Sequence, residues 1–213
     1  MTGCCDENDA HLQQMRSQQA RMLWMVLAIN AAMFLFEFTA GWWAASTALL
    51  GDSLDMLGDS LVYGLSLFVV ARSARWKAVS AGFKGMVMLI FGLLVLSEAI
   101  NKVISGHTPQ PTIMAVVGML ALAANVLCLL LLTRHRDDDV NMQSSWICSR
   151  NDLFANTGVI LAAGLVALTG SIWPDIIVGA AIATLFLYSA FGVLREARLS
   201  FASSTPPEES PAR

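Results

Sequence analysis

Three aspartates share one face of an apolar stretch. Asp52, Asp55 and Asp59 are spaced by three and four residues, so a helix would carry all three on one side. An aspartate near mid-membrane costs about 2.5–3.5 kcal/mol, and such residues normally face a bundle interior or a water-filled cavity. Asp55 and Asp59 therefore predict a cation site. Asp52 lies nearer the helix end, where capping or hydration is an equally good interpretation.

A second pair of candidate ligands begins another apolar stretch. Cys148 and Asp152 are four residues apart and share a helical face with Asn156. A lone buried cysteine is usually an apolar filler, but the neighbouring Asp152 favours a ligand here. Together the two helices would offer Asp55, Asp59, Cys148 and Asp152. One thiolate with three carboxylates suits zinc or cadmium better than magnesium or calcium, and because ligands must be deprotonated, metal and protons would compete.

The elements that would hold these residues are long apolar segments. The 213-residue chain is 56% hydrophobic and 14% charged, whereas a soluble domain is about 25% charged. Six apolar blocks, at about 22–45, 49–71, 81–104, 113–133, 146–169 and 175–194, each approach the roughly 20 residues of a bilayer-crossing helix. We expect an all-α membrane protein with six transmembrane helices. Its parts would be a polar cytoplasmic tail (1–20), a transport domain (21–196) and a short disordered tail (197–213).

Basic residues predict the orientation. Of the 13 Lys and Arg residues, Lys102 alone falls on the side opposite the N-terminus. Because cytoplasmic loops carry the excess of basic residues, both termini are expected in the cytoplasm, with the chain in a plasma membrane of the bacterial inner-membrane type. The net charge of −3 and the absence of a basic stripe argue against nucleic-acid binding.

Several motifs together resemble the cation diffusion facilitator family of metal/proton antiporters. They are Glu37-Phe38-Thr39-Ala40-Gly41, the run from Ser46 through Asp52 to Asp59, Ser97-Glu98-Ala99-Ile100 before Pro109, and the pair Cys148/Asp152. The resemblance covers about residues 20–200. It implies a lipid-embedded homodimer that exports zinc, and cadmium with it, in exchange for entering protons. The sequence contains no nucleophile–base pair, phosphate-binding loop or nucleotide motif, so we expect a transporter without enzyme activity or cofactor.

Two departures from the family pattern affect these expectations. Cys148 stands where zinc-transporting members usually have His or Asp. The family usually carries a cytoplasmic domain after the sixth helix, so the resemblance is to a variant without that C-terminal domain. Manganese, cobalt or iron(II) remain alternative cargoes, and a non-transporting metal-binding scaffold or sensor remains an alternative function.

Other polar residues allow more than one interpretation. Glu37 could hold a proton or support the metal site, but a structural hydrogen bond to a neighbouring helix is favoured. Glu98 and Lys102, four residues apart, predict an interfacial ion pair. A terminal metal-collecting segment is less favoured than a disordered tail for Cys4, Cys5 and His11.

Overall fold

The computed structural model describes residues 4–69, 74–134, 136 and 140–203, and over these ranges it contains helices and no strand. The helices are α1 (Cys4–Ala44), α2 (Thr47–Val69), α3 (Ala74–Ser105), α4 (Pro111–Thr133), α5 (Val140–Thr169) and α6 (Trp173–Ser203). Five contain a segment long and apolar enough to cross a membrane. The remaining helix, α2, carries the three aspartates. The prediction of an all-α, six-helix membrane protein is confirmed.

Short turns join the helices at one end of the bundle. Gly106 (φ 67°) follows α3 and Gly170 (φ 65°) follows α5, the left-handed conformation that ends helices. Between α1 and α2, Ala45 (φ 50°) adopts the same conformation, and the Ser46 N–H donates to the Gly41 carbonyl at 3.0 Å. We call the end of the bundle that carries these three turns the turn end. The opposite end, which carries Arg21, Arg134 and Arg195, is the basic end and is predicted to face the cytoplasm.

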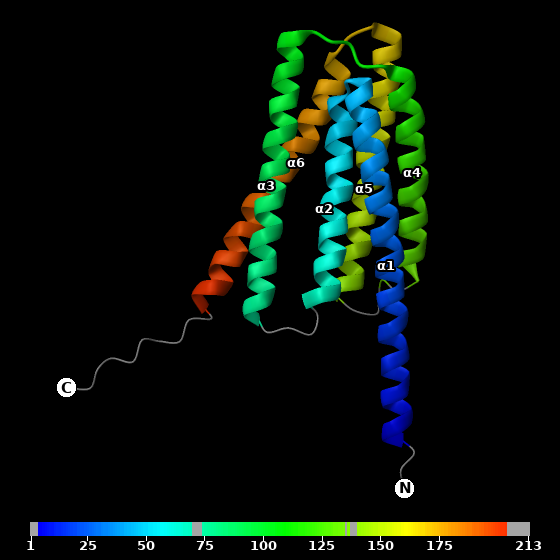
Figure 1. The fold of residues 1–213 in the computed structure, drawn as a ribbon, viewed down its shortest axis with the longest axis vertical. Helices are drawn as coiled ribbons and strands as arrows, with labels where there is room; N and C mark the ends of the chain where they lie inside the picture. The colour runs from blue at the N-terminus through cyan, green and yellow to red at the C-terminus, as the bar shows by residue number, and fades with distance from the viewer. Residues whose placement is uncertain (1–3, 70–73, 135, 137–139, 204–213) are drawn as a thin grey trace, which may run out of the picture.

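Helices pack in pairs, α1 with α2, α4 with α5, and α3 with α6. In Figure 1, α6 starts among the other helices at the turn end and runs obliquely beside α3 toward the basic end. Glycines permit this close approach, because a Cβ at Gly92 would lie 2.9 Å from the Leu187 side chain and one at Gly85 would lie 2.8 Å from Leu194. The α3–α6 pair therefore forms a separate wall facing α2 and α5.

The outer surface is apolar, as a lipid-facing surface should be. Large exposed side chains include Ile104, Leu168 and Tyr188. Several polar and charged side chains are buried inside the bundle, among them Glu37, Asp52, Lys102 and Asp175. Apolar side chains on the outside and polar ones inside reverse the arrangement of a soluble protein, because lipid rather than water surrounds the helices.

Two helices extend past their predicted ends. The apolar pattern predicted that the sixth helix would end near Leu194 and that the chain would be disordered from 197, but α6 continues to Ser203. The helix continues past the apolar block because Arg195, Glu196, Ala197 and Leu199 are strong helix formers that need no lipid contact. Residues 204–213 lie outside the described ranges. Similarly, α1 begins at Cys4, so the polar N-terminal segment from there on is helical.

Candidate metal centre

The aspartates of α2 point inward because α2 is surrounded. It packs against α1, α3, α5 and α6, so the face bearing the carboxylates has no lipid contact. Asp52 is 1% exposed and Asp59 is 8% exposed, while Asp55 is partly buried. The interpretation of Asp52 as a residue hydrated at its helix end is therefore wrong.

Across from α2, α5 contributes Asp152, which is 7% exposed. One turn later, the Asn156 side chain donates from Nδ2 to the Asp152 main-chain carbonyl at 2.9 Å. Cys148 belongs to α5, one turn before Asp152, but its side chain lies outside the described residues. Its expected role as a ligand stays a prediction.

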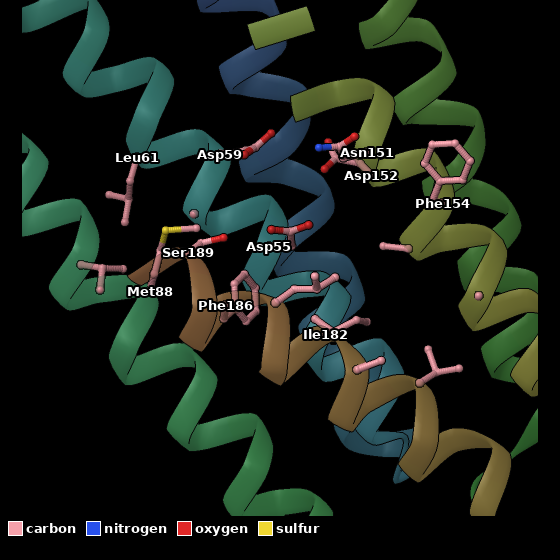
Figure 2. Close-up of a pocket in the computed structure, with 17 residues that line it drawn as sticks. Asp55, Asp59, Leu61, Met88, Asn151, Asp152, Phe154, Ile182, Phe186 and Ser189 are labelled. Carbon is pink, nitrogen blue, oxygen red and sulfur yellow. The ribbon is translucent and has the colours of Figure 1, made fainter. Parts of the chain in front are cut away.

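A cavity of about 560 Å³ separates α2 and α5 from the α3–α6 wall. Three of the four predicted ligands line it, namely Asp55, Asp59 and Asp152. Figure 2 shows these carboxylates in the same part of the cavity, facing one another from the two helices. The remaining lining is mostly apolar, with Met88 and Phe186 on the opposite wall. The cavity thus concentrates negative charge at one site within an apolar chamber.

Two of the three carboxylates are close enough to interact electrostatically, namely Asp59 on α2 and Asp152 on α5. The Tyr63 hydroxyl donates to Asp59 Oδ2 at 3.0 Å, which restrains the position of this carboxylate. Among the side chains that the structure describes, no three His, Cys, Asp or Glu residues are close enough to hold a metal ion together. The carboxylates share a cavity but are not arranged as a finished coordination sphere.

Residues 23–202 match the family model of the cation efflux transmembrane domain. The chain belongs to the cation efflux family. It is accordingly an integral, multi-pass membrane protein, in agreement with its apolar helices. The expected membership of the cation diffusion facilitator family is confirmed.

Several curated cation efflux relatives are similar over most of this chain. A protein named zinc transporter ZitB from Yersinia pestis is 25% identical over 91% of this chain and 66% of its own length. The metal cation efflux system protein CzcD of Cupriavidus metallidurans is 25% identical over 73% of this chain and 53% of its own. A cadmium, cobalt and zinc/H(+)-K(+) antiporter of Bacillus velezensis is 26% identical over 81% and 59%. The chain thus spans less than two thirds of the length of these relatives.

A second buried acidic group of this cation efflux domain lies outside the cavity. Glu37 on α1 is 0% exposed, and neither of its carboxyl oxygens has a hydrogen-bond partner in the described structure. Asp52 on α2 is 1% exposed. Neither residue lines the cavity. The structural hydrogen bond from Glu37 to a neighbouring helix that the sequence favoured is not found among the residues that the structure describes.

The turn end contains a buried ion pair that the sequence did not predict. Lys102 on α3 is 3% exposed, and its Nζ lies 2.5 Å from Oδ2 of Asp175 on α6. The predicted pair of Lys102 with Glu98 is wrong, because the i, i+4 rule weighs only neighbours on one helix, and Lys102 reaches another helix instead. A buried lysine needs an acidic partner, and this was the available signal in the sequence, but the spacing did not say which helix supplies it.

Proposed function

We propose that the chain exports divalent metal cations from the cytoplasm, with zinc as the main cargo and cadmium as a second one, in exchange for protons. The observation that carries this proposal is the convergence of Asp55, Asp59 and Asp152 on one cavity inside a membrane bundle. Charged residues within membrane helices typically mark ion pathways. The names of relatives, a zinc transporter and an antiporter for cadmium, cobalt and zinc, point in the same direction.

The proposed ligands are Asp55, Asp59, Cys148 and Asp152. A dication between the α2 and α5 carboxylates would replace their mutual repulsion with attraction, so metal binding would draw the two helices together. Thiolate and carboxylate together favour zinc and cadmium over harder ions. On this view the coordination sphere is completed as the cation arrives.

Exchange for protons follows from ligand chemistry. Carboxylic acids and thiols bind zinc only after losing their protons, so a lower pH on the far side promotes release there. One relative is named as an antiporter that uses H(+). Since the resemblance also implies a pair of chains, we expect a homodimer to be the working unit.

Flux in proteoliposomes tests the proposal. We expect zinc transport by the full chain under an imposed pH gradient, and loss of that transport to the level of empty vesicles in Asp55→Ala and Asp152→Ala. Glu98→Ala is the matched control, because Glu98 lies on a transmembrane helix but does not line the cavity. It should transport normally. Near-wild-type flux in either aspartate variant removes that residue from the site.

Cargo is tested by competition among metals. We expect zinc and cadmium to compete more strongly than cobalt, manganese or iron(II), and Cys148→Asp to shift the preference from cadmium toward manganese, because oxygen replaces a soft sulfur ligand. An unchanged selectivity profile would mean that the thiol does not bind the cargo. Metal binding without any pH-dependent flux would select the scaffold or sensor instead.

A further inference from the structure

Three buried asparagines interrupt the apolar interior formed by α1, α2, α4 and α5. Asn30 on α1 and Asn125 on α4 are each 1% exposed, and Asn156 on α5 is 0% exposed. The four helices contact one another, α1 with α2 and α4, and α5 with α2 and α4. Each asparagine belongs to the stripe of buried residues on its helix, as Asn125 does between Ala121 and Cys128. We call the three residues the asparagine layer. None of them lines the cavity of the metal centre.

Contacts between neighbouring helices place the layer at a common depth. The asparagine of α1 donates from Nδ2 to Sγ of Cys128, one turn after Asn125, at 3.9 Å. Between α4 and α5, a Cβ at Gly118 would lie 3.4 Å from a Val159 methyl carbon. These two helices run in opposite directions (Figure 1). Counting seven residues along each from this contact puts Asn125 within about one helical turn of Asn156.

The apolar core of these four helices is divided at the asparagine layer. One cluster of buried apolar residues lies toward the turn end and includes Ala44, Met114 and Ala162. Another lies toward the basic end and includes Leu23 and Leu132. Asparagine is shorter than the leucine and methionine of these clusters. Because protein interiors are close-packed, a layer of short polar side chains favours a small polar molecule between them.

Three polar atoms of the layer have no hydrogen-bond partner among the described residues, namely Asn30 Oδ1, Asn125 Nδ2 and Asn156 Oδ1. Two of the amides are held in orientation by their other atom. Asn30 Nδ2 donates to the Val26 carbonyl at 3.0 Å, and Asn156 Nδ2 donates to the Asp152 carbonyl at 2.9 Å. Lipid offers no replacement partner, so these three atoms require one inside the protein.

We propose that the asparagine layer binds a water molecule inside the membrane. Water both donates and accepts, so one molecule can donate to Asn30 Oδ1 and Asn156 Oδ1 and accept from Asn125 Nδ2. Three hydrogen bonds are typical of a buried water. A cation would face the Asn125 N–H group and an anion would face two carbonyl oxygens, so neither matches this set of donors and acceptors. The water joins α5, which carries Asp152 of the metal centre, to α1 and α4.

Oxidation by hydroxyl radicals tests for the buried water. Intense X-ray pulses generate these radicals from water, and sulfur side chains beside the water are readily oxidised. Cys128 adjoins the layer, whereas Met114 on the same helix lies in the apolar cluster near the turn end, and both are 0% exposed. We expect Cys128 of the full chain in detergent to be oxidised several-fold faster than Met114, each rate being divided by the rate in the unfolded chain.

Asn125→Leu removes the donor of the layer and should lower the oxidation rate of Cys128 toward that of Met114. Equally slow oxidation of the two sulfur side chains in wild type would overturn the proposal. So would an unchanged rate for Cys128 in the variant. Neither measurement uses metal, so the outcome is independent of the proposed function.

Melting temperatures test whether one ligand serves several asparagines. Asn30→Leu and Asn125→Leu should each lower Tm in detergent, because each leaves polar atoms of the layer without their partner. The double variant should lower Tm by less than the sum of the two shifts, since the shared water is lost only once. Asn30→Leu combined with Asn101→Leu, whose asparagine is exposed on α3, is the control and should be additive. Additive shifts for both pairs would refute a shared ligand.

If these variants do not fold, a high-resolution density map of wild type decides. A peak within hydrogen-bond distance of Asn30 Oδ1, Asn125 Nδ2 and Asn156 Oδ1 would support the proposal. Amides bonded directly to one another would overturn it. A peak that appears only in a sodium or potassium salt would mark a cation and would also overturn it.

Discussion

Replacing Asp175 with alanine should strongly destabilise the bundle. Asp175 is 0% exposed and accepts four hydrogen bonds. Its Oδ1 accepts from the Ser46 hydroxyl at 2.5 Å and the Ala48 N–H at 3.2 Å. Its Oδ2 accepts from the Thr47 N–H at 2.8 Å and from Lys102 Nζ at 2.5 Å. One side chain of α6 therefore caps the start of α2 and neutralises a buried lysine of α3.

The expected effect follows from these contacts. Removing one partner of a buried ion pair costs about 3–5 kcal/mol, and removing a helix N-cap costs about 0.5–2 kcal/mol. Lys102 would still donate to the Ala45 carbonyl, which keeps the loss toward the lower part of the combined range. We expect Asp175→Ala to lower the free energy of unfolding by about 4 kcal/mol. At about 2–4 °C per kcal/mol for a chain of this size, Tm should fall by about 10 °C.

The effect is measured by heating the protein in detergent and determining how much of it still elutes as folded protein. Asp175→Asn keeps one side-chain oxygen and loses the charge, so its stability should lie between that of wild type and that of Asp175→Ala. The double variant Lys102→Met/Asp175→Asn should be more stable than Asp175→Ala, because it leaves no unpaired buried charge. Glu98→Ala, on the same turn-end half of α3 as Lys102, should change the stability by less than about 0.5 kcal/mol. A comparably small change in Asp175→Ala would refute the reasoning.

Two further substitutions probe packing and ligand orientation. Gly179→Ala should destabilise by about 1–3 kcal/mol, because the new Cβ would lie 2.7 Å from a Thr47 methyl carbon and 3.0 Å from its main-chain carbonyl carbon. Gly192→Ala, with open space around it, is the control in the same unfolding measurement, and equal effects would contradict the packing argument. Tyr63→Phe removes the hydroxyl that donates to Asp59, and zinc affinity measured by calorimetry should fall about tenfold. Unchanged affinity would mean that the hydroxyl does not orient a ligand.

Much of the fold was predictable because lipid imposes strong rules on the sequence. Apolar length and proline or glycine breaks located all six helices, and α4 begins at Pro111, near the predicted 113. Helix ends outside the apolar blocks were not predictable from hydropathy. A run of apolar residues predicts a helix in lipid, but it does not indicate whether the helix continues beyond the lipid, as α6 does over 197–203.

Helix pairing limited the prediction of the sites. Spacing placed Asp55 and Asp59 on one face, and the structure gives both to the cavity that Asp152 also lines. Spacing could not reveal that Asp175 lies next to Lys102, since 73 residues separate them along the chain. Nor could it reveal that Glu37 has no protein donor within the bundle. Both relations depend on which helices touch, and periodicity within one helix does not contain that information.

Counting the donors around each buried carboxyl group separates their roles. Four donors surround Asp175, so its charge is fully compensated and it needs no further ligand. Glu37 has no protein donor on either oxygen. Both acids are equally buried, so burial alone cannot distinguish a structural carboxylate from one that binds a cation. A buried acid whose hydrogen bonds are already complete holds the helices in place. A buried acid whose oxygens have no donor still needs a proton or a cation, so the contacts assign Asp175 to the scaffold and leave Glu37 without such a structural role.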